Sequence, residues 1–92
     1  MTSDWKVKKI ATNKELSALG RNIARHRRMQ EISQEELSFR CDLHRTYLSD
    51  VERGARNLSF NSILVIARGL GLTVSELTRD VEIDAAVERP SE

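Results

Sequence analysis

This sequence contains few of the residues that build disulfide frameworks, metal sites and membrane spans. Its 92 residues include one cysteine, one proline, four glycines and four aromatic residues. The single cysteine, Cys41, excludes an internal disulfide framework and a zinc site built from several cysteines. No apolar run approaches the roughly 18–20 residues that cross a bilayer. The first residues, MTSDWKVKKI, lack the apolar core of a signal peptide, so we expect a cytoplasmic protein without membrane contact.

Sequence patterns typical of catalysis are missing as well. The two histidines, His26 and His44, have no partners at metal-ligand spacing. No HExxH, GxxxxGK or GxSxG pattern occurs. We therefore expect a protein that is not an enzyme and that needs no metal and no cofactor.

The net charge of +1 conceals an uneven distribution of charge along the chain. Residues 1–57 hold 12 Lys/Arg against 8 Asp/Glu, a net charge of +4, whereas residues 58–92 hold 3 against 6, a net charge of −3. A basic first part favours a surface that binds an anionic partner. Charge clusters on small domains are equally common on faces that only contact solvent, so both interpretations stay open at this point.

Apolar residues recur with helical spacing over most of the chain, and strand-like alternation is almost absent. The pattern predicts an all-α fold of five helices between residues 13 and 78, preceded by an N-terminal arm (1–12) and followed by an acidic C-terminal tail (79–92). The first predicted helix spans residues 13–29, and the second begins at Ser33 and has two or three turns. The third spans residues 45–53, and the fourth runs from Ser59 to Gly71. A short fifth helix begins at Thr73 and either ends near Thr78 or extends to Ile83.

Two of these helices, joined by a three-residue turn, make a helix-turn-helix unit between Gln34 and Arg53. Its apolar positions are Leu37, Leu43, Leu48 and Val51. The other face of the second helix is too polar to pack in a core, and it carries Arg45, Thr46, Ser49, Asp50 and Arg53. A short polar helix face of this kind favours contact with nucleic acid.

The string ISQEELSFRCDLHRTYLSDVERGARNLS, residues 32–59, closely resembles the Cro/CI-type (XRE-like) helix-turn-helix family. Its SQEEL, RTYLSDVERG and RN segments are similar to those of the controller proteins of restriction–modification systems. The resemblance covers roughly residues 14–78. It implies a lambda-repressor-like domain that binds a pseudo-palindromic operator as a dimer, and control of a restriction–modification operon and of its own promoter.

Three positions depart from the pattern of this family. The family usually has glycine where this chain has Glu31 and Asp42, and a glutamate in the left-handed region costs roughly 1 kcal/mol. We therefore expect the turn before residue 33 to adopt another shape. His44 stands where a serine or threonine commonly caps the second helix of the unit, and histidine is a poor cap.

Arg45 and Thr46 start the helix whose N-terminal end is expected to enter the major groove of DNA. Arginine can bind the O6 and N7 atoms of guanine with two parallel hydrogen bonds, and threonine can offer a hydroxyl or a methyl group to a base edge. The resemblance points to the same two residues and adds Arg56 as a contact with the groove or with the DNA backbone. Asp50 could accept a hydrogen bond from cytosine, or it could repel phosphate.

Four residues are expected to contact phosphate, which positions a protein on DNA without reading its sequence. The resemblance implies this role for Gln34. The hydroxyl of Tyr47, the charge of Arg53 and the amide of Asn57 suit it as well. Tyr47 could instead pack against the preceding helix.

Arg27 falls on the apolar stripe of the first predicted helix, together with Leu16, Leu19 and Ile23. An unpaired buried charge is costly, so Arg27 needs an anionic partner. Glu52 is the acid of the 45–53 helix nearest to its apolar face. The resemblance supports a structural ion pair between Arg27 and Glu52.

One short helix reads only about four base pairs, so we expect a homodimer that binds two half-sites of double-stranded operator DNA. Leu72, Val74 and Leu77 are the candidate interface residues, although they could instead complete the core of the monomer. Activation would add a contact with RNA polymerase, whereas repression needs only occlusion of a promoter. The alternative function is that of an antitoxin-type protein, which binds a partner toxin and regulates its own promoter.

Overall fold

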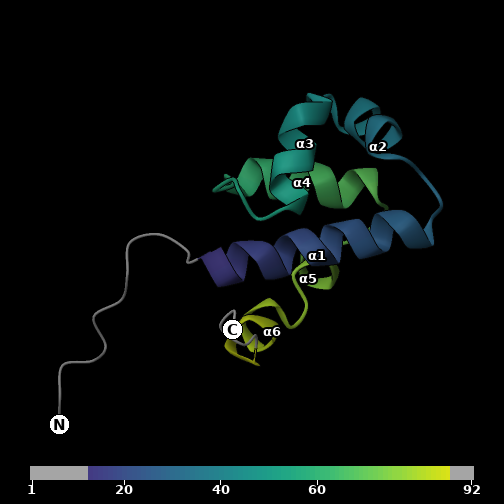
Figure 1. Ribbon diagram of the computed structural model, residues 1–92. Coiled ribbons are helices and arrows are strands. Elements are labelled where there is room, and N and C mark those ends of the chain that lie inside the picture. Colours follow the sequence, from purple (N-terminus) through teal and green to yellow (C-terminus); the bar gives the residue numbers. More distant parts are fainter. Residues whose placement is uncertain (1–12, 88–92) are drawn as a thin grey trace, which may run out of the picture.

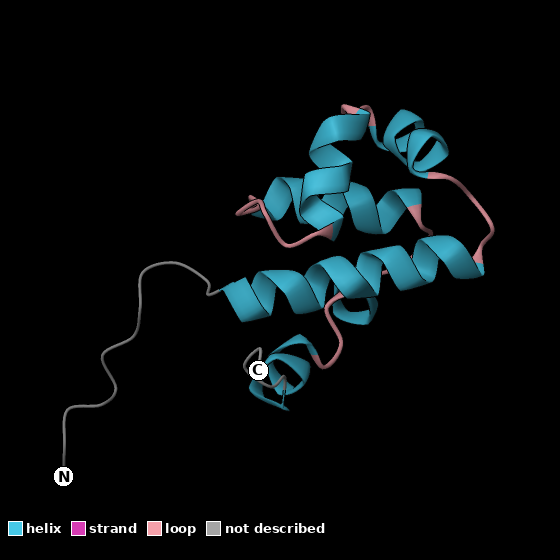
Figure 2. Ribbon diagram, in the orientation of Figure 1, coloured by secondary structure: helices cyan, strands magenta, loops and turns pink. Residues whose placement is uncertain are grey.

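The computed structural model describes residues 13–87, and within this range it contains helices and no strand (Figure 2). The prediction of an all-α fold is therefore confirmed. The N-terminal arm expected over residues 1–12 lies outside the described residues. The five helices expected between residues 13 and 78 are all present: α1 (Asn13–Met29), α2 (Gln34–Cys41), α3 (Arg45–Glu52), α4 (Phe60–Gly69) and α5 (Val74–Leu77).

A sixth helix, α6 (Val81–Val87), lies in the segment expected to be an acidic tail. It packs against α1 and buries Ala85. The buried amide of Asn22 on α1 fixes the segment that leads into α6, because its Nδ2 atom donates hydrogen bonds to the backbone carbonyls of Leu77, the last residue of α5, at 2.9 Å and of Arg79 at 3.0 Å. The folded part of the chain thus continues beyond residue 78, and the expected start of the tail is corrected accordingly.

The core lies between α1 and the layer that α2, α3 and α4 form above it in Figure 1, with α6 on the opposite side of α1. Its buried residues are Leu19, Ile23, Leu37, Cys41, Leu48, Val51, Ile66, Ala67, Leu70 and Leu77. No single helix in the described range is long and apolar enough to cross a membrane. Within that range, one pair of segments, α4 and residues 74–86, has the required length and apolar composition when taken together, but the two segments meet at an angle of 94°.

Side-chain caps fix the starts of α2 and α5 where the sequence indicates them. The hydroxyl of Ser33 accepts a hydrogen bond from the N–H of Glu36 at 2.9 Å. The carboxylate of Glu36 pairs with Arg40 at 3.1 Å, so this end of α2 has half of a capping box. At α5 the box is complete, because Thr73 and Glu76 each bind the other's backbone N–H.

The turn between α1 and α2 keeps a left-handed backbone in spite of its glutamate. Glu31 has a φ of 59°, and Asp42 in the next turn has a φ of 55°. The expectation of another turn shape is therefore wrong. The N–H of Ile32 donates to the carbonyl of Arg27 at 3.3 Å, and the Arg27 guanidinium donates to the carbonyl of Ile32 at 2.9 Å. These bonds hold the turn closed, so the surrounding structure outweighs the cost of the glutamate.

Gly20 allows α1 and α3 to approach each other closely. A Cβ atom at this position would lie 2.5 Å from the backbone oxygens of Val51 and Glu52. Gly20→Ala is expected to lower the free energy of unfolding by about 1–3 kcal/mol, because the two helices must separate, although alanine favours a helix. Urea unfolding followed by circular dichroism measures this loss.

Gly71→Ala provides the comparison for this prediction. No atom lies within 4 Å of a Cβ at Gly71, whose φ is +72°. The expected loss there is only the conformational cost, roughly 1 kcal/mol. A Gly20→Ala protein as stable as the parent would contradict the close approach of α1 and α3.

Candidate nucleic-acid interface

α3 presents its polar face to solvent and its apolar face to the core. Leu48 and Val51 are 0% and 1% exposed and hold the helix against the rest of the domain. Arg45 and Thr46, at the N-terminal end of α3, are exposed. His44 makes no side-chain cap to α3, in agreement with the prediction. The start of α3 is thus accessible to a large partner.

Asp50 holds two of the arginines that are predicted to contact DNA. Its carboxylate pairs with Arg53, the residue that caps the C-terminal end of α3, and lies 3.5 Å from the Nε atom of Arg56. The side chain of Asp50 is 22% exposed, whereas those of Arg53 and Arg56 are 64% and 49% exposed. Asp50 thus positions both guanidinium groups. The three-residue spacing of Asp50 and Arg53 is the signal that indicates their pairing.

Tyr47 links α3 to α4 and supports Arg56. Its hydroxyl donates a hydrogen bond to the Oγ atom of Ser62 at 3.2 Å, and its half-buried ring packs against the core. The guanidinium carbon of Arg56 lies 4.9 Å from the centre of this ring, a cation–π contact. Asn57 follows Arg56 in the loop before α4, and it is exposed. Tyr47 and Arg56 therefore lie in contact, and Asn57 follows them in the adjoining loop.

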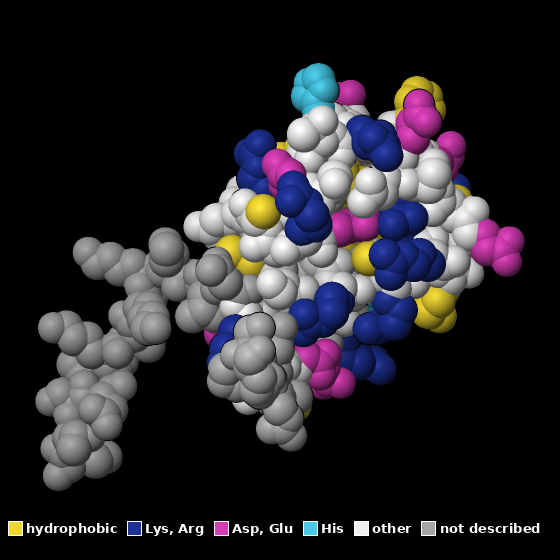
Figure 3. All heavy atoms as spheres, viewed as in Figure 1, with side chains coloured by type: hydrophobic (Ala, Val, Ile, Leu, Met, Phe, Trp, Pro, Cys, Tyr) yellow, Lys and Arg dark blue, Asp and Glu magenta, His cyan; other side chains and the backbone are white. Residues whose placement is uncertain are grey.

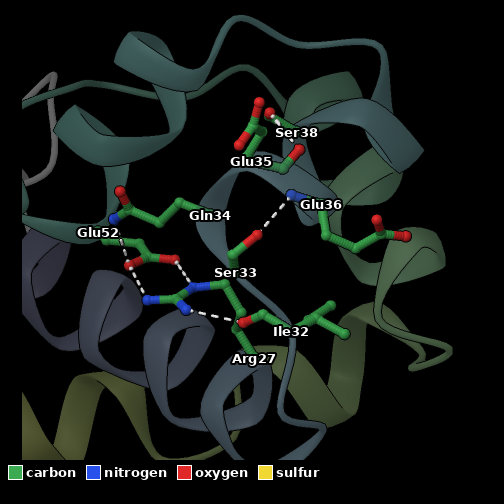
Figure 4. Close-up of polar contacts among 8 residues, drawn as sticks. All are labelled: Arg27, Ile32, Ser33, Gln34, Glu35, Glu36, Ser38 and Glu52. Carbon is green, nitrogen blue, oxygen red and sulfur yellow. Dashed lines mark hydrogen bonds and ion pairs between the residues drawn. The ribbon is translucent and has the colours of Figure 1, made fainter.

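Arg27 and Glu52 form the ion pair that is expected between α1 and α3 (Figure 4). The Nε and Nη2 atoms of Arg27 lie 2.7 and 3.0 Å from the two carboxylate oxygens of Glu52. The side chains are 11% and 5% exposed. The hydrogen bond with Glu52 raises the pKa of Arg27 above its ordinary value, although burial acts in the opposite direction. Arg27 thus remains charged, and the pair holds α1 against α3.

Gln34, the first residue of α2, joins the same network. Its Nε2 atom donates a hydrogen bond to Glu52 at 2.9 Å. An amide nitrogen carries two hydrogens, so Gln34 retains one donor for another acceptor. The predicted phosphate contact is thus compatible with this bond, and Glu52 fixes the direction of the amide.

The predicted interface residues Leu72, Val74 and Leu77 do not share one exposed surface. Leu77 is 0% exposed and belongs to the core, so its assignment to a dimer interface is wrong. Leu72 and Val74 are half-buried and pack against the same core. Ile83 on α6 is 62% exposed. Apolar spacing in a sequence cannot distinguish a core position from an interface position, which explains the error.

Cys41 lies buried between α2 and α4. Its thiol is 3.5 Å from the backbone carbonyl of Val65 on α4. Burial raises the pKa of this thiol, which keeps it protonated at neutral pH. Among residues 13–87, no group of three or more His, Cys, Asp or Glu is arranged to hold a metal ion. The exposed groups near α3 are mainly guanidinium, hydroxyl and amide donors, which suit the phosphates and base edges of a nucleic acid.

Comparison with known proteins points in the same direction. The family model described as helix-turn-helix matches residues 23–77. A stretch of 46 residues is 54% identical to the control protein C.BamHI of Bacillus amyloliquefaciens, covering 50% of this chain and 57% of that protein. The chain thus spans little more than half the length of this curated relative.

Two solved structures are similar over most of the described domain. The restriction–modification controller protein C.AhdI from Aeromonas hydrophila shares 38% identity with a TM-score of 0.67, over 68% of this chain and 96% of its own. The controller protein C.Esp1396I, solved as a tetramer in complex with its natural 35 base-pair operator, shares 29% identity with a TM-score of 0.70. That match covers 78% of this chain and 95% of the other.

Proposed function

This chain belongs to the helix-turn-helix family, and from that premise we propose that it is a sequence-specific DNA-binding regulator of the restriction–modification controller type. The observation that carries the proposal is the exposed N-terminal end of α3, where Arg45 and Thr46 face solvent. An α-helix fits into the major groove of B-DNA, which is about 12 Å wide. The similarity to C.BamHI and C.AhdI supports the same function.

Three side chains read the bases in the proposed complex. Arg45 binds the O6 and N7 atoms of a guanine, and Thr46 contacts a neighbouring base edge. Arg56 reaches the groove from the loop after α3, directed by its contacts with Asp50 and Tyr47. Because these contacts exist before DNA binds, little ordering of Arg56 is required at that moment.

Phosphate contacts on either side of α3 set the position of the domain on the duplex. Gln34 uses its remaining amide hydrogen at the start of α2, and Asn57 uses its amide in the loop before α4. Arg53 exchanges part of its pairing with Asp50 for a phosphate. The hydroxyl of Tyr47 leaves Ser62 and donates a hydrogen bond to a phosphate of the same DNA backbone.

A homodimer binds the two halves of a pseudo-palindromic operator. Two half-sites about one helical turn apart match the two-fold symmetry of such a dimer. Leu72 and Val74 contribute to the interface through their exposed parts, and C.Esp1396I provides a precedent for assembly on an operator. The bound dimer represses a promoter by occlusion or activates it by contact with RNA polymerase, and it controls a restriction–modification operon and its own gene.

Selection of bound duplexes from a random pool tests this function. We expect the pool to converge on a pseudo-palindrome with a guanine in each half-site. Sedimentation of the protein with the selected duplex should give two copies for each duplex. A pool that stays random after several rounds would refute sequence-specific binding.

Arg45→Ala should relax the preference at one base position. The expected loss of discrimination is about 1–3 kcal/mol, with little change on random duplexes. Asn57→Ala is the matched variant, because loss of a phosphate contact weakens binding to all sequences alike. Titration of both variants with the selected and a scrambled duplex measures the difference. Equal losses on the two duplexes for Arg45→Ala would remove its assignment as a base reader.

A further inference from the structure

A basic groove adjoins the proposed DNA-reading surface. It has a volume of about 500 Å³ and is lined by Arg21, Arg25 and Arg28 of α1, by Gln34 and Arg53 next to them, and by the carboxylates of Glu52 and Asp84. We call it the α1 groove. Lys and Arg side chains, dark blue in Figure 3, gather over α1 on the face that also carries α3. Four arginines thus surround a hollow that holds two carboxylates, one of which is already paired with Arg27.

The arginines of the α1 groove repel one another. Arg21, Arg25 and Arg28 follow at spacings of four and three residues, and like charges at these spacings destabilise a helix. Arg25 and Arg28 are exposed, and within residues 13–87 neither forms an ion pair. The Nη1 atom of Arg25 donates a hydrogen bond to the amide oxygen of Asn22 at 3.0 Å, which directs it without neutralising it. Arg25 and Arg28 thus present two positive charges that no carboxylate of residues 13–87 pairs with, and both attract an anion that enters the groove.

We infer that Arg25 and Arg28 bind the phosphate backbone of DNA, outside the helix-turn-helix unit. The inference rests on the proposed function. Gln34 and Arg53 line the α1 groove and are also proposed phosphate contacts at the two ends of the unit. A duplex that lies on α3 and reaches both residues brings one of its strands to the mouth of the groove. This continuity favours the DNA backbone over an acidic segment of a partner protein.

Asp84 limits where an anion can bind. Asp84 lines the groove from α6, and its negative charge repels phosphate, so the phosphate lies on the side of Arg25 and Arg28. Glu52 opposes binding much less, because Arg27 and Gln34 already occupy its oxygens.

The salt dependence of DNA binding tests the inference. The plot of log K against log salt has a negative slope, and its steepness decreases by about 0.9 for each phosphate contact that is lost. Arg28→Gln, present twice in a dimer, should therefore flatten the slope by about 1.8 and weaken binding by the same factor on selected and random duplexes. Arg25→Gln combined with Arg28→Gln should flatten it about twice as much. Circular dichroism checks that the variants are folded.

Arg68→Gln is the matched control. Arg68 is exposed on α4, outside the α1 groove, and its replacement removes the same charge. Its slope should stay close to that of the parent. The inference is overturned if Arg28→Gln keeps the parental slope, or if Arg68→Gln flattens the slope equally. A parent protein that cannot distinguish selected from random duplexes would instead remove the proposed function itself.

Discussion

Glu52→Ala is expected to lower the free energy of unfolding by about 3–5 kcal/mol. The substitution leaves the guanidinium of Arg27, 11% exposed, without its anion, and it also removes the acceptor of the Gln34 amide. A buried charge without a partner keeps its desolvation penalty and loses the attraction that compensated it. Urea unfolding at pH 7, with circular dichroism at several protein concentrations, measures the change independently of association.

Glu36→Ala is the appropriate control for this measurement. It also removes one carboxylate from an arginine pair, but the side chains of Arg40 and Glu36 are 39% and 48% exposed. Exposed pairs of this kind contribute only about 0.3–0.5 kcal/mol. If Glu52→Ala melted within a degree of the parent, the pair with Arg27 would have no structural role.

Leu77→Ala is expected to cost about 2–5 kcal/mol of stability, the range found when a fully buried leucine leaves a cavity. Leu77 is 0% exposed, and its backbone carbonyl accepts a hydrogen bond from Asn22. The loss should therefore appear in the unfolding of the monomer. Denaturation at low micromolar concentration gives its size, and sedimentation reports any change in association.

Leu72→Ala separates the two roles that apolar residues near α5 can have. Leu72 is only half-buried, so we expect a smaller loss of stability than for Leu77→Ala. An effect on dimer formation should be seen with Leu72→Ala and not with Leu77→Ala at temperatures where both are folded. A Leu77→Ala protein that is as stable as the parent but does not associate would restore Leu77 to the interface.

The helices and their ends could be predicted because their signals are local. α1 begins and ends at the predicted residues, Asn13 and Met29. Gly54 follows α3 with a φ of 76°, the left-handed conformation that glycine adopts most easily after a helix. The outward face of α3 also followed from sequence, since Leu48 and Val51 leave only one direction for the polar residues.

Features that depend on particular side-chain contacts in the folded chain were not predictable in this way. Glu31 keeps the left-handed turn because Arg27 closes it, and its residue type alone indicated the opposite. The sequence left Asp50 open between accepting a hydrogen bond from cytosine and repelling phosphate, whereas in the structure its carboxylate pairs with Arg53 and lies near Arg56. α6 packs on α1 through an acidic stretch whose composition resembled that of a tail. In each case the outcome depends on a contact that exists only in the folded chain.

The position of Cys41 makes its thiol a probe of local opening between α2 and α4. Its thiol is covered by α2 and α4 and kept in the protonated, unreactive form. A small alkylating reagent can reach it only when these two helices part. Because the sequence has no other cysteine, the rate of labelling at this one sulfur atom measures how often α2 separates from α4.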